Sequence, residues 1–304
     1  MTEIRLAMAT REETFERVRD PLGERGIAVE HVRVDERTLP LDAPEGADGS
    51  ADGPRPGGEF AGFDVGFVFP SRAMEGGVAD ALLGVPWVND REAVLRSRNK
   101  ADVLARLARA GVPVPRSTLV SNPVDDAAVE AALERFEFPL VVKPNSTTRG
   151  TGVTRVPDLD AALGVTDYLD LVHDYRATGD RSYLLQEYLP DARDYRVMCI
   201  EGEYAGAVER RLPDEVLDSG GWKHNVHRGA VATGVRPPAE HREVAEAAAR
   251  ALGIGWLGVD LLVTGNRVVV NETNARPTVD NATKYEDGFY DGLAGLIRRT
   301  ASGL

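Results

Sequence analysis

Strand and helix patterns alternate along the first 90 residues of the chain and lose this alternation afterwards, and this change constrains the fold more than any other feature. Apolar runs at 3–9, 27–35, 63–70 and 85–90 predict strands, and two amphipathic segments between them predict helices. A series of this kind is typical of a small parallel sheet covered by helices. We therefore predict an α/β unit over residues 1–92. A GxGxxG sequence, which a dinucleotide-binding unit carries after its first strand, is missing.

The rest of the chain mixes strands and helices without a fixed order, which predicts an α+β region. We divide it into a central subdomain (93–185) and a C-terminal subdomain (186–304). The C-terminal part contains two predicted hairpins, one that turns at Gly202 and one with a three-residue turn at 265–267. Residues 41–60 are rich in Gly, Pro, Ala and Asp and lack apolar periodicity, so we expect a flexible surface loop there.

The charge balance is strongly acidic, with 49 Asp and Glu residues against 36 Lys and Arg residues and a formal net charge of −13. This balance argues against nucleic-acid binding, which needs positive charge to displace counterions. It indicates a salt-adapted surface, and we hypothesise a halophilic source. The single cysteine, Cys199, allows no internal disulfide. No stretch resembles a signal peptide or a membrane span, so we expect a cytoplasmic protein.

The stretch VVKPNSTTRGTGV (141–153) carries the first functional signal. A short apolar strand ends in Lys143, and a polar loop with two glycines follows. The backbone N–H groups of such a loop can fold over phosphates, and the lysine can add a point charge. An ordinary hairpin with a lysine that extends into solvent is the alternative, and the stretch alone leaves both open. The chain has three other lysines: Lys100, Lys223 and Lys284.

The last predicted hairpin places three oxygen-bearing side chains together. Glu272 and Asn274 are two residues apart and lie on one face of a strand, and Asp260 pairs with Glu272 if the turn has three residues. Carboxylate and amide oxygens suit Mg²⁺ or Mn²⁺. The polar face of an exposed hairpin is the alternative. We favour a metal site, because carboxylates within Val- and Leu-rich strands need a partner when they are buried.

The segment QEYLP (186–190) has the composition of a nucleotide hinge. Glu187 ends an apolar strand and precedes an aromatic and an aliphatic residue, so its polar groups can read an adenine edge while side chains enclose the ring. Asp194 lies a few residues further on and can accept hydrogen bonds from ribose hydroxyls. An edge strand that ends at Pro190 is the alternative.

The order of these pieces resembles the ATP-grasp superfamily of carboxylate–amine ligases, and within it the RimK-type glutamate ligases. A lysine before a helix is followed by the strand with its glycine loop, QEYL, DYR, KHNVHRGA, GVDLL and NETNARP. Each motif alone is weakly specific, whereas the whole series in this order and spacing is strongly specific. The resemblance is close over about 100–300 and looser before it. It implies an ATP-grasp fold, in which two subdomains enclose ATP.

The resemblance implies a nucleotide site made of several groups of residues. Lys100 and Lys143 match the lysines that grip nucleotide phosphates. A lid loop matches Ser146, Thr147, Thr148, Arg149, Gly150, Thr151 and Gly152. The family's adenine hinge corresponds to Glu187, Tyr188 and Leu189. Its ribose-binding carboxylate corresponds to Asp194. The segment that lines the triphosphate corresponds to Lys223, His224 and Asn225.

The resemblance also implies catalytic and metal-binding residues. Arg228 matches the arginine of the family's Asn-x-x-Arg-Gly motif, and with Lys223 and Asn225 it is expected to contact the transferred group. The ligands of one or two Mg²⁺ or Mn²⁺ ions match Asp260, Glu272 and Asn274.

The sequence departs from the family pattern at several positions, so the resemblance does not identify the substrate. Thr147 stands where related RimK-type ligases carry glycine, and the stretch before Asp194 is two residues shorter. Arg276 stands where the ribosomal-protein modifiers have a small residue, so it is a candidate contact for phosphate or for the acceptor. Arg210, at the end of a predicted hairpin, either contacts a substrate carboxylate or lies in solvent.

The activity that the resemblance implies is ATP-dependent formation of an amide bond. ATP phosphorylates a carboxylate, an amine attacks the acyl phosphate, and ADP and phosphate are released. The expected substrates are a small-molecule, coenzyme or peptide carboxylate acceptor and an amino-acid donor such as glutamate. A regulatory nucleotide-binding module without turnover and a phosphotransferase that releases the acyl phosphate remain alternatives, and homo-oligomerisation is left open.

Overall fold

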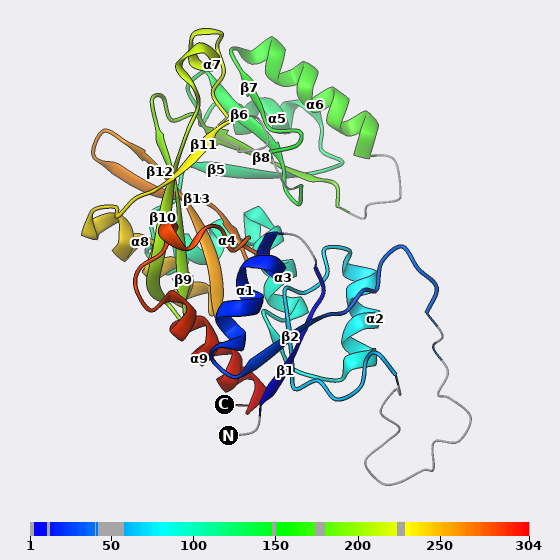
Figure 1. Ribbon diagram of the computed structural model, residues 1–304. Helices are drawn as coiled ribbons and strands as arrows, with labels where there is room; N and C mark the ends of the chain where they lie inside the picture. The colour runs from blue at the N-terminus through cyan, green and yellow to red at the C-terminus, as the bar shows by residue number, and fades with distance from the viewer. Residues whose placement is uncertain are drawn as a thin grey trace.

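The computed structural model describes residues 3–10, 13–39, 41, 58–147, 150–173, 180–223 and 229–303. These residues form three β-sheets with helices packed around them (Figure 1). No helix within these ranges is both long and apolar enough to cross a membrane. Of the loop predicted at 41–60, residues 42–57 lie outside the described residues.

The N-terminal unit is a four-stranded parallel sheet in the order β2–β1–β3–β4, which confirms the predicted α/β unit. Its strands are β1 (Ile4–Met8), β2 (Ile27–His31), β3 (Val65–Phe67) and β4 (Trp87–Val88), and its helices are α1 (Glu13–Gly23) and α2 (Ala73–Leu83). Every residue of β3 and the last three residues of β1 are buried. Such continuous burial is typical of parallel strands covered on both faces.

The central sheet has four antiparallel strands in the order β5–β8–β6–β7. Its strands are β5 (Ser117–Ser121), β6 (Leu140–Pro144), β7 (Thr154–Val156) and β8 (Ser182–Glu187), and its helices are α5 (Asp126–Leu133) and α6 (Leu159–His173). It has a hydrophobic core of its own, which includes Leu140, Tyr183 and Leu185. Figure 1 shows it at the upper right of the molecule, beside the upper end of the C-terminal sheet.

The C-terminal sheet has five antiparallel strands in the order β11–β10–β9–β12–β13. Its strands are β9 (Arg193–Ile200), β10 (Glu203–Arg211), β11 (Val231–Gly234), β12 (Trp256–Thr264) and β13 (Arg267–Asn274), and its helices are α7 (Asp214–Asp218), α8 (Ala239–Leu252), the 3₁₀ turn Ala282–Lys284 and α9 (Phe289–Ala301). The predicted hairpin at Gly202 is confirmed, since Glu201 and Gly202, both with positive φ, connect β9 to β10.

Two elements, α7 and β11, lie in the segment between β10 and α8, for which the sequence pattern predicted neither a helix nor a strand. No residue of α7 is buried, and β11 is an edge strand whose residues are exposed or half-buried. Elements that bury no apolar face leave no hydrophobic period in the sequence, so the pattern missed both.

Helices α3 (Arg91–Arg98) and α4 (Lys100–Arg109) follow the N-terminal unit in sequence but pack against β13, and α4 also packs against α8. Their buried Val94, Val103 and Leu107 belong to the same hydrophobic cluster as the C-terminal sheet. The sequence-based division at residues 92 and 185, which grouped these helices with the central subdomain, stays a prediction.

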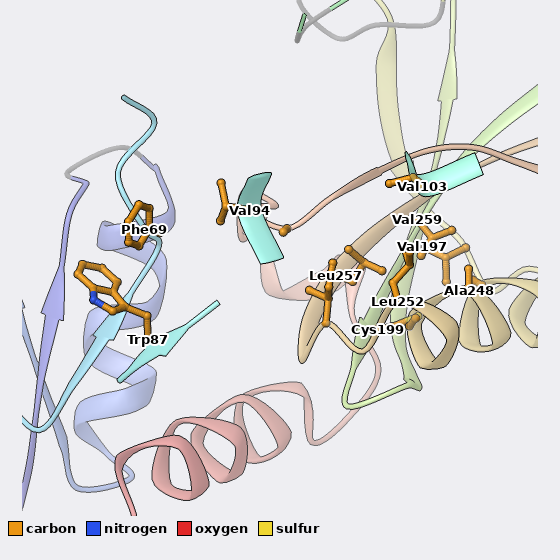
Figure 2. Close-up of a cluster of buried hydrophobic side chains, with 14 of the residues drawn as sticks. Phe69, Trp87, Val94, Val103, Val197, Cys199, Ala248, Leu252, Leu257 and Val259 are labelled. Carbon is orange, nitrogen blue, oxygen red and sulfur yellow. The ribbon is translucent and has the colours of Figure 1, made fainter. Parts of the chain in front are cut away.

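This cluster joins the N-terminal unit to the C-terminal sheet. Figure 2 shows it running from Phe69 and Trp87 of the N-terminal unit, past Val94, to Leu257 of the C-terminal sheet. Cys199 is buried in the cluster, and burial raises the pKa of its thiol to about 12. A thiol that stays protonated is a poor nucleophile, and its burial makes Cys199 a core residue.

Asn89 ties the N-terminal unit to the same sheet by hydrogen bonds. Its buried side-chain amide donates to the carbonyls of Trp256 at 2.5 Å and Ala275 at 2.7 Å, and its Oδ1 accepts from the Trp256 N–H at 3.0 Å. These three bonds satisfy backbone groups that solvent does not reach.

The substitution Asn89→Ala is therefore expected to lower the free energy of unfolding by about 3 kcal/mol, because it leaves several buried backbone groups without a partner. Chemical denaturation monitored by circular dichroism measures this loss. Asn266→Ala is the matched control, because Asn266 is exposed and makes no described side-chain hydrogen bond. A change of equal size in both variants would contradict the assignment.

Candidate functional site

Two cavities meet where the central sheet faces the C-terminal sheet. The smaller, of about 450 Å³, is lined by β6, β7, the segment after β8 and the hairpin of β12 and β13. The larger, of about 730 Å³, extends from the lid loop and the start of α4 to the N-terminal unit. Arg210 and Glu272 line both cavities, so ligands in the two cavities would meet at these side chains.

Lys100 and Lys143 are brought together at this junction by Asn145. Asn99 caps α4 by accepting from the Asp102 N–H at 3.1 Å, which places Lys100 at the first helical position. Asn145 follows β6, accepts from the Ala101 N–H at 2.8 Å and donates to Asn99 Oδ1 at 3.0 Å. The start of α4 is thus fixed to the end of the strand that carries Lys143.

Both lysines are buried, which contradicts the alternative of a hairpin lysine that extends into solvent. Lys143 is 3% exposed and donates to Asn271 Oδ1 at 3.2 Å, and Lys100 donates to the lid carbonyl of Thr147. Burial lowers the pKa of Lys143 to about 8, although the nearby Glu272 carboxylate opposes the shift. Burial also lowers the pKa of Lys100. Two ammonium groups held in a poorly solvated place are well suited to bind an anion.

The lid loop is described in part. Ser146, Thr147 and Thr151 line the larger cavity, Gly150 lines the smaller one, and Thr147 Oγ1 donates to the Thr151 carbonyl at 2.8 Å. Gly152 adopts positive φ, with Pro144 in the space that a Cβ would occupy. The predicted lid residues Thr148 and Arg149 lie outside the described residues.

Glu187 ends β8, an inner strand of the central sheet, so the alternative of an edge strand is wrong. Its carboxylate accepts from Arg267 Nη2 at 2.7 Å and from the Arg116 N–H at 2.7 Å, and the Arg267 guanidinium holds the pKa of Glu187 below its usual range. The Glu187 N–H also donates to the Arg116 carbonyl at 3.0 Å. The carboxylate is therefore engaged within the protein.

Aromatic and cationic side chains surround the smaller cavity next to this hinge. The rings of Tyr188 and Trp222 meet edge to face with centroids 5.9 Å apart. The Arg155 guanidinium lies 5.2 Å from the Tyr188 ring, and Lys223 Nζ lies 5.4 Å from the Trp222 ring. Leu189, also predicted as a hinge residue, lines this cavity. Trp222 and Arg155 were missed, although the aromatic residue directly before Lys223 was a usable signal.

Four charged side chains lie at the junction of the cavities, of which Asp194, Asp260 and Arg210 are buried and Arg196 is half-buried. Arg196 Nε and Nη2 donate to the two Asp260 oxygens at 2.7 and 2.8 Å, and Arg210 Nη2 contacts Asp260 at 2.9 Å and Asp194 at 2.5 Å. Burial would raise the pKa of Asp260, but the guanidinium groups of Arg196 and Arg210 outweigh it and hold this pKa far below its usual range. Burial raises the pKa of Asp194.

Arg210 is only 7% exposed, so the alternative of a solvated strand end is wrong. Asp194, predicted to bind ribose, lines the smaller cavity with its carboxylate held by Arg210.

Two of the predicted metal ligands, Asp260 and Glu272, pair across the hairpin as expected, although the turn differs from the predicted one. Asp260 is directly opposite Glu272, yet the turn has two residues, Gly265 and Asn266, because Thr264 pairs with Arg267. The three-residue turn is therefore wrong. Opposite the step from Asp260 to Leu261, Asn271 is an extra residue of β13 and forms a β-bulge, which restores the pairing of Asp260 with Glu272. The side chain of Asn271 contacts Lys143.

The three predicted ligands differ in their access to the cavities. Glu272 and Asn274 line the larger cavity, whereas Asp260 is 2% exposed and covered by two guanidinium groups. Its burial contradicts the alternative of an exposed polar face. No cluster of three or more His, Cys, Asp or Glu side chains suited to a metal occurs in the part of the chain that the structure describes.

Arg276 lines the larger cavity and donates through Nε to the carbonyl of Phe69 in the N-terminal unit. Lys223 is described, but the predicted His224, Asn225 and Arg228 lie outside the described residues. Their placement thus stays a prediction.

Solved structures share this fold along nearly the whole chain. A D-cycloserine synthetase, DcsG, has a TM-score of 0.68 and 22% identity and covers 96% of this chain and 99% of its own. A RimK domain protein from Sphaerobacter thermophilus has a TM-score of 0.65, with 22% identity and 97% and 98% coverage. The D-alanine–D-alanine ligase of Bacillus anthracis in complex with ATP has a TM-score of 0.66 at 17% identity, with 100% and 98% coverage. The fold is therefore the ATP-grasp fold.

Sequence comparison defines the family more narrowly. The RimK-like ATP-grasp domain family matches residues 97–288. A probable alpha-L-glutamate ligase of Enterobacter is 32% identical over 205 residues, and the ribosomal protein bS6–L-glutamate ligase of Escherichia coli is 31% identical over 205 residues. Each match covers 67% of this chain and 64% of the relative's own length. The chain belongs to the RimK-like ATP-grasp family, as the motif order predicted.

Replacing Lys143 with methionine is expected to stabilise the unliganded protein. Its folded pKa of about 8 lies below the ordinary value of 10.5, so burial of the charged amine costs free energy that is fully present below pH 8 and fades as the pH rises toward 10.5. We expect Lys143→Met to raise the free energy of unfolding by up to about 3 kcal/mol at pH 7, and by less at pH 10.

Denaturant titrations at the two pH values measure this gain. Lys284→Met is the control, because it removes a 2.6 Å ion pair with Asp280 and should give no gain. Equal stability of wild type and Lys143→Met at pH 7 would contradict the burial cost.

Proposed function

We propose that the chain is an ATP-dependent carboxylate–amine ligase that forms an amide bond through an acyl phosphate and releases ADP. The observation that carries the proposal is the meeting of the two cavities at Arg210 and Glu272. The smaller cavity has hinge and aromatic residues suited to a nucleotide base, and the larger one has cations suited to a carboxylate. A carboxylate in the larger cavity can therefore meet the terminal phosphate of a nucleotide in the smaller one.

ATP is proposed to bind in the smaller cavity with its base beside Tyr188, Leu189 and Trp222. The hinge backbone would read the adenine edge, because the Glu187 carboxylate is bound to Arg267. Lys143 and Lys223 line the same cavity and would contact the phosphates. The aromatic rings offer flat apolar surface to the base.

Mg²⁺ or Mn²⁺ is proposed to bind with the phosphates at Glu272 and Asn274, whose oxygens suit a hard cation. Asp260 stays a predicted third ligand, and it would join only after Arg196 and Arg210 release its carboxylate. When bound, the ion neutralises charge that develops on the transferred phosphate.

The lysines, the lid and Arg228 are proposed to have separate roles in the reaction. Lys100 and Lys143 reduce the repulsion between the substrate carboxylate and the phosphates. The lid at 146–152 would exclude water, which otherwise hydrolyses the acyl phosphate. Arg228 is proposed to hold the acyl-phosphate oxygens while an amine attacks the acyl carbon and phosphate leaves.

The proposed substrates are glutamate, as the amine donor, and a small-molecule or peptide carboxylate, as the acceptor. The support is the names of the relatives, of which one is the ribosomal protein bS6–L-glutamate ligase. The chain spans about 64% of that relative's length, so the acceptor is not carried over from it.

The first test is ADP release with Mg²⁺ and ATP against a panel of carboxylate acceptors, with glutamate present and then omitted. A ligase is expected to release ADP only when both partners are present. Glu272→Ala should lower this rate about 100-fold, because it removes charge compensation at the phosphates. Glu134→Ala should leave the rate unchanged, because Glu134 is exposed and lines neither cavity.

ADP release that needs the acceptor but ignores the amine would favour a phosphotransferase instead. Tight ATP binding without ADP release across the panel would favour a regulatory module.

A separate test concerns the nucleotide base. Trp222→Ala is expected to weaken binding of the ATP analogue AMP-PNP about tenfold, because base–aromatic contacts are worth about 1–3 kcal/mol. Trp222→Phe should retain most of the affinity. Isothermal titration calorimetry measures both, and unchanged affinity in Trp222→Ala would exclude contact between this ring and the base.

A further inference from the structure

The bulge in β13 turns the side chain of Asn271 toward the smaller cavity. Neighbouring residues of a regular strand point to opposite faces of the sheet, yet Asn271 and Glu272 both line this cavity. Val270 pairs with Leu261. Glu272 pairs with Asp260, so Asn271 has no residue opposite it and is free to turn. The bulge therefore adds a side chain to the site that a regular hairpin would direct elsewhere.

The contact with Lys143 fixes the orientation of the Asn271 amide. Lys143 Nζ donates to Asn271 Oδ1 at 3.2 Å. An ammonium group has three donors and no acceptor, so the amide oxygen must face the lysine and the NH₂ group must point elsewhere. Among the described residues, Asn271 Nδ2 forms no hydrogen bond. Asn271 is also half-buried at the cavity wall, so its NH₂ group is available to a ligand there.

The same contact determines where the Lys143 ammonium lies. The lysine side chain is long and flexible and can place its charge at several points. Within the part of the chain that the structure describes, Asn271 Oδ1 is the one hydrogen-bond acceptor of this ammonium. The shorter asparagine side chain is attached to a strand and has fewer conformations, so it anchors the longer one.

The surroundings of the Asn271 NH₂ group suit a phosphate oxygen. Lys143, Lys223 and Arg155 line the same cavity and favour an anion. Phosphate oxygens accept hydrogen bonds, which an amide NH₂ group can donate. Asn271 is neutral and lies directly beside Glu272, where a second carboxylate would repel phosphate.

We propose that Asn271 is a phosphate-binding residue of the nucleotide site, in which Oδ1 positions Lys143 and Nδ2 donates to a phosphate oxygen. The inference rests on the proposed function for the place of the nucleotide in the smaller cavity. The two roles can be separated, because positioning of Lys143 requires only the oxygen and the phosphate contact requires the NH₂ group.

Calorimetric titration with AMP-PNP and with adenosine tests the phosphate contact. EDTA is present, so that a carboxylate introduced by substitution recruits no metal ion. Asn271→Leu has a similar shape and lacks both polar groups, whereas Asn271→Asp keeps an oxygen for Lys143 and loses the NH₂ group. Each is expected to weaken AMP-PNP binding at least about tenfold and to leave adenosine binding unchanged.

Asn266→Asp is the matched control, because Asn266 is an exposed turn residue of the same hairpin and lines neither cavity. It should leave the affinity for both probes unchanged. Unchanged adenosine binding also shows that each Asn271 variant is folded.

A double-mutant cycle tests the positioning of Lys143. In the Lys143→Met background, Asn271→Leu should weaken AMP-PNP binding only about threefold, because no ammonium is left to position. Equal losses in the two backgrounds would overturn the positioning role.

AMP-PNP affinity of Asn271→Asp equal to that of the wild type would overturn the phosphate contact. An equal loss of adenosine affinity would also overturn it, because the amide would then contact the base or the ribose. ADP release, measured separately with Mg²⁺ and both substrates, decides the ligase proposal, so failure of one is distinguishable from failure of the other.

Discussion

The C-terminal sheet depends on four charged side chains, three buried and one half-buried, that balance one another. Arg210 is directly opposite Asp194 on β9, and Arg196 of β9 is directly opposite Asp260 on β12, so the charges form a continuous chain across three neighbouring strands. Desolvation of each ion costs several kcal/mol, and removal of one member of such a group typically costs about 3–5 kcal/mol. The four residues therefore stabilise the sheet only as a group, because the loss of one leaves its partner's charge uncompensated. Because three of the four line the cavities where these meet, the charges that hold the sheet also set the electrostatics of the candidate site.

Much of the architecture could be predicted because it is periodic. The parallel sheet of the N-terminal unit followed from the alternation of strand and helix patterns, and the pairing of Asp260 with Glu272 followed from the expected register of a hairpin. That pairing was correct because two deviations cancel: a turn one residue shorter than predicted and a bulge of one residue at Asn271. A bulge has no periodic signature, so the sequence could predict the pair but not the contact of Asn271 with Lys143.

The parts of the site that the sequence could not supply are contacts between distant segments. Asn145 lies in the glycine loop that the sequence singled out. Its role, to fix the end of β6 to the start of α4, depends on a partner about 45 residues away in the chain. The capture of Asp260 by Arg196 and Arg210 depends on three strands lying side by side. The pattern of a single sequence gives information about residues that are close in the chain. The pKa of a buried carboxylate depends instead on charged groups that are close in space and distant in the chain.

The connection between the central sheet and the rest of the molecule has a mechanical consequence. The chain enters this sheet at Arg116 and leaves it at Glu187, and these two crossing points are bonded to each other through backbone and carboxylate. The central sheet has a hydrophobic core of its own and a second attachment at the start of α4, where Asn145 bonds to Asn99 and Ala101. The predicted hinge 187–189 begins at the first attachment, and Ser146 and Thr147 of the predicted lid follow the second. A nucleotide bound between them would contact both attachments, so its binding would restrain the central sheet relative to the C-terminal sheet.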